Sequence, residues 1–164
     1  MNKPVISGDY FIYKDMRYDV EFYEITDGKI PDLDWCQVYA VGNLDGKVPI
    51  VKYPHAKDNL PGGGVRDGED VEQALKREVK EELNMQVKSW YPIGYQRNID
   101  QNGDSYYQLR VYAELEKIGE FVRDPDGSVA GYDLIEINNL NSHIKWGGIG
   151  GWLIERVKTN YGQL

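Results

Sequence analysis

Three glutamates, Glu78, Glu81 and Glu82, lie close enough in the sequence to do chemistry together. In a helix, residues three and four positions apart are neighbours, so the three carboxylates fall on one side of it, beside Arg77. Carboxylates crowded in this way repel one another unless a positive charge lies among them. Because oxygen-only ligands suit a hard cation, the spacing predicts a site for Mg²⁺ or Mn²⁺.

The same residues have a simpler interpretation as a solvated acidic helix face. In that case Lys76, Lys80 and Arg77 would form exposed ion pairs with the glutamates, since runs of charge usually face water. The glycines at 62–64, which precede the helix, favour the metal site instead. Without side chains, the main chain there can come close to a metal ion or a phosphate.

A longer pattern surrounds the carboxylates. A glycine, five residues, a glutamate, seven residues and then Arg-Glu-apolar-x-Glu-Glu-x-Gly-apolar fall on the following positions: Gly63, Glu69, Arg77, Glu78, Val79, Glu81, Glu82 and Met85. This segment resembles the Nudix box, and the chain is identified as a member of the Nudix hydrolase (MutT-like) family. The last glycine of the box is replaced by Asn84, which is the next most tolerated residue in the left-handed conformation that ends a helix. We therefore expect the carboxylates to keep their places.

The resemblance implies a hydrolase that cleaves the diphosphate linkage of a nucleoside diphosphate joined to another group. It implies Glu78 and Glu82 as principal metal ligands, with Glu81 as a third ligand or a supporting group. The backbone carbonyl of Gly62 would complete the site. Divalent ions would neutralise the negative charge that gathers when water attacks phosphorus.

The remaining catalytic roles also follow from the resemblance. Arg77 would orient Glu69 or a helix glutamate through a charge-assisted hydrogen bond. The general base is open between Glu78, acting on a water molecule, and a carboxylate from a later loop. Asp133 is the best later candidate, because it lies at the start of the last strand; it is otherwise a fourth metal ligand or a strand-edge charge. The weaker candidates are Glu114, Glu116, Glu120, Asp124 and Asp126.

Thirteen tyrosines and four tryptophans are many for 164 residues. Some are expected to line a cleft in which they stack on a nucleotide base, although most aromatic residues in strands belong to the core. The candidates for this substrate-binding role are Tyr95, Tyr107, Tyr132 and Trp146. The glycine-rich run at 147–151 is interpreted as a connector ahead of the last helix.

The elements that must position these residues alternate between strands and helices. Asp70 and Gln73 form a capping-box pattern at the start of a helix over 71–83. Strands are expected at 35–41, 48–53, 87–98, 105–115 and 132–137, with a hairpin over 9–26, a loop over 54–64 and a final helix over 151–161. This order predicts an α/β fold, the Nudix α/β/α sandwich with a mixed sheet.

The chain is expected to have two parts. Residues 35–164 would form the Nudix hydrolase domain. Residues 1–34 would be a strand-rich N-terminal extension that provides extra strands, a substrate lid or, as the favoured interpretation, a contact in a homodimer.

Composition limits the partners. The net charge of −8 argues against a nucleic-acid polymer, whose backbone needs Lys and Arg to replace its counterions. The single cysteine, Cys36, excludes an internal disulfide, and no apolar stretch approaches the ~18 residues of a membrane helix. The expected protein is cytoplasmic and acts on a small nucleotide-type substrate.

The range of possible substrates is reduced only by elimination. Markers of the ADP-ribose, dinucleoside-polyphosphate and coenzyme A groups are absent, which favours a nucleoside triphosphate or a nucleotide sugar. The alternative is a catalytically silent Nudix-fold module that binds a nucleotide. Silent members usually lose box glutamates, whereas this chain keeps all of them.

Overall fold

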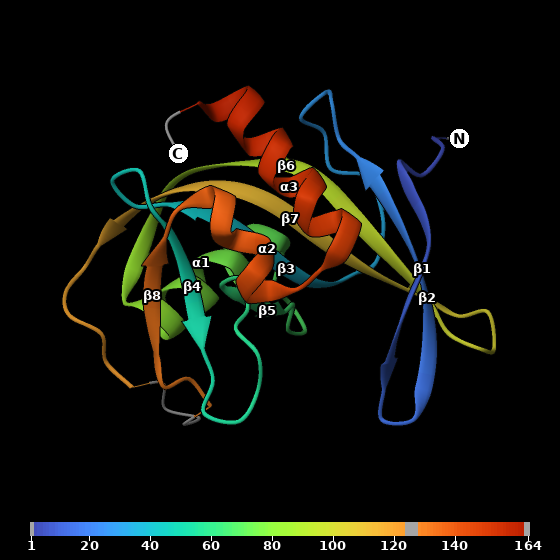
Figure 1. The fold of residues 1–164 in the computed structure, drawn as a ribbon, viewed down its shortest axis with the longest axis horizontal. Coiled ribbons are helices and arrows are strands. Elements are labelled where there is room, and N and C mark those ends of the chain that lie inside the picture. The colour runs from blue at the N-terminus through green and yellow to red at the C-terminus, as the bar shows by residue number, and fades with distance from the viewer. Residues whose placement is uncertain (1, 124–127, 163–164) are drawn as a thin grey trace.

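The computed structural model describes residues 2–123 and 128–162, and its elements alternate between strands and helices (Figure 1). In chain order they are β1 (Ile6–Tyr13), β2 (Met16–Glu24), β3 (Trp35–Asn43), β4 (Val48–Lys52), β5 (Gly62–Gly64), α1 (Val71–Leu83), β6 (Met85–Ile99), β7 (Ser105–Lys117), β8 (Gly131–Ile135), a 3₁₀ turn (Ile137–Asn139), α2 (Leu140–Ile144) and α3 (Gly147–Tyr161).

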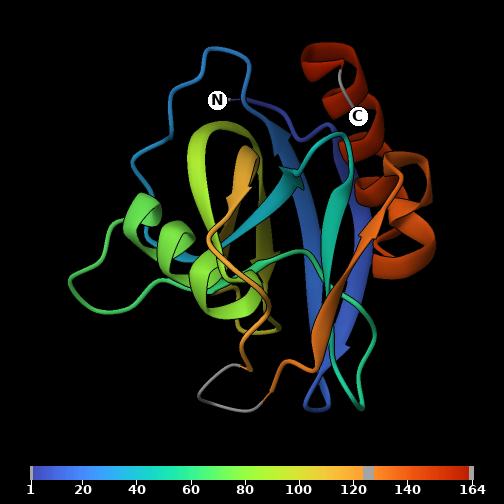
Figure 2. The ribbon, with the colours of Figure 1, turned by 90° about the vertical axis from the view of Figure 1, so that its left-hand side faces the viewer.

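Six strands form one mixed sheet in the order β1-β2-β6-β7-β3-β5, and β4 pairs with β8 in a second, two-stranded sheet. Only β3 and β7 run parallel to each other; the other pairs are antiparallel. Helix α1 lies on one side of the strands and α2 and α3 on the other (Figure 2). This arrangement is the α/β/α sandwich that the sequence predicts.

Each face of the six-stranded sheet has its own core. Along β3, Val38 and Ala40 belong to the core beneath α1, whereas Tyr39 and Val41 face the core beneath α3. A strand that is covered on both faces is apolar along most of its length, which accounts for the run in this segment. Strand β3 therefore lies at the centre of the sandwich.

The N-terminal residues are continuous with this sheet. Strands β1 and β2 form the hairpin that is predicted for residues 9–26. Its turn at Lys14 and Asp15 has positive φ at both positions. Strand β2 pairs with β6, and Phe22 is fully buried in the core beneath α3. The hairpin projects from the edge of the sheet at the right of Figure 1.

Helix α1 has the predicted bounds and the predicted cap. The Asp70 carboxylate accepts a hydrogen bond from the backbone of Gln73, whose side chain accepts one from the backbone of Asp70. The helix ends at Asn84, which has φ 51° in the left-handed region. The Asn84 side chain also donates to the carbonyl of Glu120 at 2.7 Å, a contact that the sequence does not indicate.

Several predicted elements differ from the structure. The predicted loop over 54–64 ends in a short edge strand, β5, because the glycines of Gly62–Gly64 pair with β3. A tight turn at Asp45 and Gly46 follows β3, but β4 leaves the main sheet to pair with β8. The glycine-rich run at 147–151 is the first part of α3 and is no connector. Helix α2 was not predicted.

Close packing explains one of the glycines in α3. A Cβ atom on Gly150 would lie 2.0 Å from Oδ1 of Asn141 in α2, the oxygen that accepts a hydrogen bond from the backbone of Trp146. A side chain at position 150 would therefore displace this contact. A composition rich in glycine usually indicates a loop, and this tertiary contact overrides the local preference. No helix in the described part of the chain is long and apolar enough to cross a membrane.

The end of α1 gives a test of the cap. Asn84→Gly removes one side-chain hydrogen bond but relieves the left-handed conformation, so the free energy of unfolding should fall by no more than about 1 kcal/mol. Asn84→Ala loses the same bond and keeps the strain, and it should be less stable than Asn84→Gly by about 1 kcal/mol. Urea denaturation of both variants measures the difference, and equal stabilities would contradict this account of the cap.

Candidate active site

The site forms where the glycines of β5 meet α1. Glu82 is 4% exposed, and its carboxylate accepts hydrogen bonds from the backbone N–H of Gly62 at 2.7 Å and the hydroxyl of Tyr53 at 3.2 Å. Burial, with Glu82 nearby, raises the pKa of Tyr53, so this hydroxyl stays protonated and can donate. Glu82 is thus fixed against the glycine strand from two directions.

Glu78 lies against the next glycine. A Cβ atom on Gly63 would be 2.6 Å from Oε1 of Glu78, so the carboxylate occupies space that any other residue would fill. The neighbouring Gly64 has room for a side chain, because a Cβ atom there would lie 3.9 Å from its nearest neighbour, the carbonyl oxygen of Cys36. The glycines at 62 and 63 therefore allow Glu82 and Glu78 to lie close to the backbone of β5.

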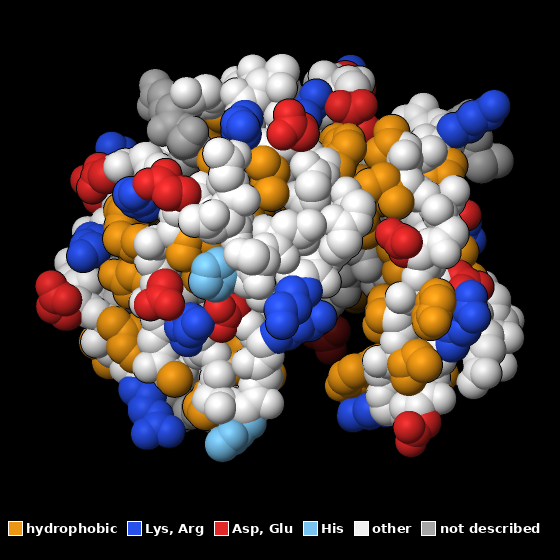
Figure 3. Space-filling model, viewed as in Figure 1, with side chains coloured by type: hydrophobic (Ala, Val, Ile, Leu, Met, Phe, Trp, Pro, Cys, Tyr) orange, Lys and Arg blue, Asp and Glu red, His pale blue; other side chains and the backbone are white. Residues whose placement is uncertain are grey.

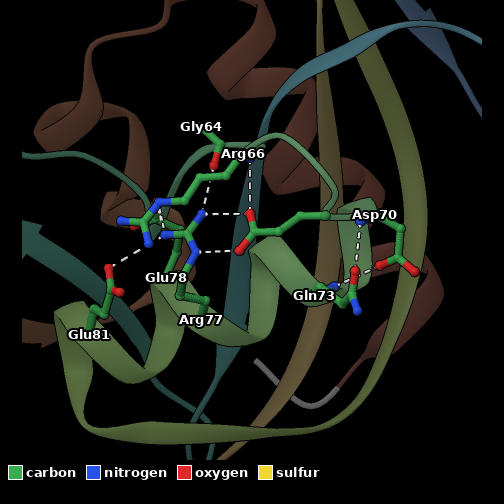
Figure 4. Close-up of polar contacts among 8 residues, drawn as sticks. Gly64, Arg66, Asp70, Gln73, Arg77, Glu78 and Glu81 are labelled. Atoms are coloured by element: carbon green, nitrogen blue, oxygen red, sulfur yellow. Dashed lines mark hydrogen bonds and ion pairs between the residues drawn. The ribbon is translucent and has the colours of Figure 1, made fainter.

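Arg77 connects the carboxylates to each other and to the strand (Figure 4). Its guanidinium donates to both oxygens of Glu69 at 2.6 and 2.9 Å, to Glu78 at 2.7 Å and to Glu81 at 3.4 Å. It also donates to the carbonyl oxygen of Gly64 at 2.8 Å. The side chains of Arg77 and Glu78 are each only 16% exposed, which excludes a fully solvated helix face for this pair.

Two of the three carboxylates that contact Arg77, those of Glu69 and Glu78, differ in their ionisation. Hydrogen bonds from the Arg77 side chain, and then from the backbone of Arg66, lower the pKa of Glu69 to about 2. Burial raises the pKa of Glu78 above its ordinary value, and the contact with Arg77 offsets only part of this effect. Glu69 is therefore a fixed negative charge, whereas Glu78 holds a proton more readily than an exposed glutamate.

The donor set has the chemistry of a hard-cation site. Glu78, Glu81 and Glu82 supply only oxygen atoms, and they gather around Arg77 and the β5 glycines. Within residues 2–123 and 128–162, however, no three acidic, histidine or cysteine side chains already converge as a metal centre does. Arg77 supplies the positive charge in this arrangement, so a metal ion would have to take Glu78 and Glu81 from it.

The candidates for a later general base lie elsewhere. Asp133 is on β8, its side chain is 57% exposed, and its ion pair is with Lys52 at 3.6 Å. Glu114 accepts hydrogen bonds from Tyr112 and Asn43 at the far end of the sheet. The structure brings neither of them to the α1 carboxylates by a hydrogen bond or ion pair, and Asp124 and Asp126 lie outside the described residues.

The four predicted aromatic residues do not gather in one place. Tyr95 and Tyr107 lie with their ring centroids 6.5 Å apart, on the α1 face of the sheet. Tyr132 packs against Phe121, with 6.3 Å between centroids. Trp146 lies on the opposite face, over the guanidinium of Arg110.

A pocket of about 400 Å³ lies between the β1–β2 hairpin and the remaining strands of the six-stranded sheet. Its lining residues come from both sides: Phe11, Tyr13, Tyr18, Cys36, Gln37, Gly64, Asn98, Tyr106 and Gln108. Figure 3 shows the surface hollowed between the projecting hairpin and the body of the protein. Because Gly64 lines this pocket and also binds Arg77, the pocket adjoins the carboxylate site.

Sequence reasoning missed this pocket and the charge behind it. The aromatic alternation of residues 9–26 indicates the hairpin, but it does not reveal which face turns toward the main sheet. Arg110, on β7, is 2% exposed, and burial lowers its pKa to about 10, which leaves it protonated near neutral pH. A lone arginine in an apolar strand carries no local pattern that predicts burial.

Comparison with known proteins identifies the family. The family model for the NUDIX domain matches residues 28–150, so the chain belongs to the Nudix family. A Nudix hydrolase of Deinococcus radiodurans is 44% identical over a segment that covers 38% of this chain and 44% of the relative. The match thus spans less than half the length of that curated relative.

Solved structures share the fold. The pyrophosphohydrolase BsRppH of Bacillus subtilis superposes with a TM-score of 0.70 at 21% identity, covering 93% of this chain and 97% of that one. A NUDIX hydrolase of Nitrosomonas europaea gives 0.62 at 22% identity, covering 77% and 90%. A MutT NUDIX hydrolase of Burkholderia pseudomallei gives 0.58 at 24% identity, covering 74% and 95%.

The pair formed by Arg77 and Glu69 has a testable pH dependence. Since folding lowers the pKa of Glu69 from 4.5 to about 2, the pair stabilises the protein above pH 4.5 and this stability is lost as the pH falls toward 2. In Arg77→Gln, the pKa of Glu69 should rise toward its ordinary value. Carboxyl NMR titration with a chelator present measures it, and Glu72, which pairs with Lys76, is the internal control. An unchanged Glu69 titration would contradict the assignment.

Proposed function

We propose that this protein is a divalent-metal-dependent hydrolase that cleaves the diphosphate linkage of a nucleoside diphosphate derivative by attack of water at phosphorus. A nucleoside triphosphate or a nucleotide sugar is the favoured substrate. Family membership and the complete set of box glutamates support an active hydrolase over a silent nucleotide-binding module. The observation that carries the proposal is the convergence of Glu78 and Glu82 on adjacent glycines of β5.

We assign Glu78, Glu81 and Glu82, with the backbone carbonyl of Gly62, to hold Mg²⁺ or Mn²⁺. When bound, the ion supplies positive charge that stabilises the negative charge developing on the phosphate oxygens. Arg77, released in part from Glu78, keeps Glu69 and the carbonyl of Gly64 in place. A rigid helix packed on a glycine strand suits this task, because such catalysis depends on positioning.

The residues of the chain also provide for proton transfer. Glu78 lies within the carboxylate cluster, bonded to Arg77 at 2.7 Å and against Gly63, where a general base could reach a water held at the site. This position favours Glu78 over Asp133, whose side chain is mostly exposed and paired with Lys52. We therefore assign the general base to Glu78, which places it beside the attacking water.

The nucleoside part of the substrate belongs in the pocket that Gly64 shares with the carboxylate site. The hairpin side chains Phe11, Tyr13 and Tyr18 form its outer wall, and aromatic rings of this kind stack on bases. This position gives residues 1–34 a role as a substrate wall. Tyr10 and Ile12, which alternate with the lining residues, are exposed and remain available for the proposed homodimer contact.

The proposal is tested with a panel of nucleoside triphosphates, nucleotide sugars and dinucleotides, each assayed with Mg²⁺, with Mn²⁺ and with chelator. Release of a phosphate-containing product that requires a divalent ion supports it. A purified, folded protein that binds nucleotides but hydrolyses none of them would favour the silent module.

Glu82 is the most informative single position. Glu82→Gln preserves the shape and can still accept from Gly62, but it removes the negative charge needed at the metal. The kcat should fall on the order of 10²-fold or more, as when one preorganised electrostatic group is lost. Glu72→Gln makes the same change on the exposed face of α1 and should retain activity. A folded Glu82→Gln protein with normal kcat would remove Glu82 from the metal site.

The glycine strand allows a steric test of Glu78. Gly63→Ala places a methyl group where the Glu78 carboxylate lies, and this flexible side chain can move away without unfolding the protein. Activity should therefore drop at least about tenfold while the melting temperature changes little, since small displacements at a catalytic centre are costly. Gly151→Ala, in α3 and away from the site, adds the same methyl group where nothing lies within 4 Å and serves as the matched control. Equal activities in the two variants would contradict the assigned position of Glu78.

A further inference from the structure

Arg110 is a buried cation without a counterion. Its guanidinium is enclosed by the rings of Trp146 and Tyr39, whose centroids lie 4.5 and 5.1 Å from the central carbon. Within the described residues no carboxylate contacts it, and its Nε has no hydrogen-bond partner. A buried charge usually has an ionic partner, because removing it from water is expensive. The structure instead surrounds this charge with amides.

The amides are oriented by the cation. Arg110 donates to Oε1 of Gln96 at 3.0 Å and to Oε1 of Gln108 at 2.9 Å. A guanidinium only donates, so both glutamines must turn their oxygen atoms toward it and their NH₂ groups away. The NH₂ of Gln96 then donates to Oδ1 of Asn98, and that of Gln108 donates to Oε1 of Gln37.

The two chains of hydrogen bonds end in donors at the pocket. The oxygens of Gln37 and Asn98 are already used, and the NH₂ group of neither residue has a protein acceptor in the described part of the chain. Both residues line the pocket between the hairpin and the sheet, together with Gln108. The sheet side of this pocket therefore presents N–H groups, and their direction is determined by a positive charge that does not itself line the pocket.

The opposite wall is aromatic. Phe11 and Tyr18 are stacked with 5.1 Å between ring centroids, and Tyr106 meets Tyr18 edge-on at 6.2 Å. Planar rings facing a row of hydrogen-bond donors suit a flat ligand with acceptors along its edge. Nucleobases are such ligands, and they differ from one another in the donors and acceptors on their edges.

We propose that Arg110 is a positioning residue for base selectivity, which makes the pocket prefer bases with a carbonyl edge over bases with an amino group there. This inference rests on the proposed nucleotide substrate. Guanine and hypoxanthine present the O6 and N7 acceptors, whereas adenine presents its N6 amino donor beside N7. An amino group facing the N–H groups of Gln37 and Asn98 would leave donors opposed without an acceptor between them.

The test measures binding without catalysis. GMP, IMP and AMP are titrated with chelator present into the ¹⁵N-labelled protein, and NMR follows the side-chain NH₂ signals of asparagine and glutamine. GMP and IMP should bind on the order of tenfold more tightly than AMP, and their binding should shift the signals of Gln37 and Asn98. IMP separates the carbonyl edge from the 2-amino group of guanine.

Two substitutions of Arg110 separate selectivity from structure. Arg110→Met replaces the charge by an apolar side chain of similar length, and such changes are often tolerated in a core. The glutamines are then free to flip, so the ratio of GMP to AMP affinity should fall close to one. Arg110→Lys still donates to both oxygens and should retain the preference, a rescue that a purely structural role would not predict.

A third variant probes the pocket directly if the Arg110 variants are unstable. Gln37→Glu keeps the acceptor for Gln108 but replaces the donor that faces the pocket, and the affinity ratio should fall. Gln101→Glu makes the same change on an exposed turn and should leave the ratio unchanged.

The outcomes distinguish this inference from the proposed function. AMP binding as tightly as GMP, or no shift of the pocket amides with any nucleotide, would overturn the inference. If the protein hydrolyses nucleotides without preference among bases, the function stands and the inference fails. A preference for GMP in a protein that hydrolyses nothing would support the inference and overturn the hydrolase.

Discussion

The close approach of a glycine strand to an acidic helix is the constraint on which the rest of this structure depends. Strand β5 has no side chains, so Glu78 can lie against Gly63 and Glu82 can accept from the backbone of Gly62. Gly62 itself has φ 147°, and a Cβ atom there would lie 2.1 Å from the carbonyl oxygen of Val38. Both the edge of the sheet and the position of α1 follow from this contact.

Two arginines organise the two halves of the site in different ways. Arg77 is surrounded by three carboxylates, and its single charge offsets part of theirs. Arg110 contacts amide oxygens and aromatic rings, so its positive charge orients neutral groups. The first arrangement lies where we propose phosphate chemistry, and the second orients the amides of the pocket that we propose for base recognition.

Much of the fold could be predicted from local pattern. Helix α1, its cap at Asp70 and its left-handed end at Asn84 follow from residues within one or two turns of each other. The β6–β7 pair follows from alternation around an Asn-Gly turn, and its strands extend slightly beyond the predicted bounds. The mixed sheet follows from the order of the elements together with the family resemblance.

The differences arise where a distant contact decides the outcome. Strand β5 is three glycines with little intrinsic strand preference, and only its pairing with β3 makes it a strand. In α3, Gly150 lies close to the side chain of Asn141, a contact that local sequence does not reveal. In the candidate site, helical spacing groups Arg77 with Glu78 and Glu81, and the family resemblance adds Glu69.

Spacing could not group the amides of the pocket with the arginine behind them. Gln96, Gln108 and Arg110 become neighbours only through the register of antiparallel strands, and Gln37 joins them through the parallel pairing of β3 with β7. Their side chains are ordinary strand residues when each strand is considered alone. No local signal distinguishes a buried amide chain of this kind from a row of exposed polar positions.

Strand β1 forms one edge of the sheet, and seven of its eight residues are exposed, whereas α1 is anchored by buried side chains along its length. Elements with little buried surface separate from a protein at lower free energy than those in its core. In the proposed binding mode, the aromatic side chains on β1 could therefore shift for ligands of different breadth without disturbing the carboxylates. Such a division would let a lineage of these proteins change what it recognises by altering an edge hairpin, while the chemistry stays on a scaffold that does not move.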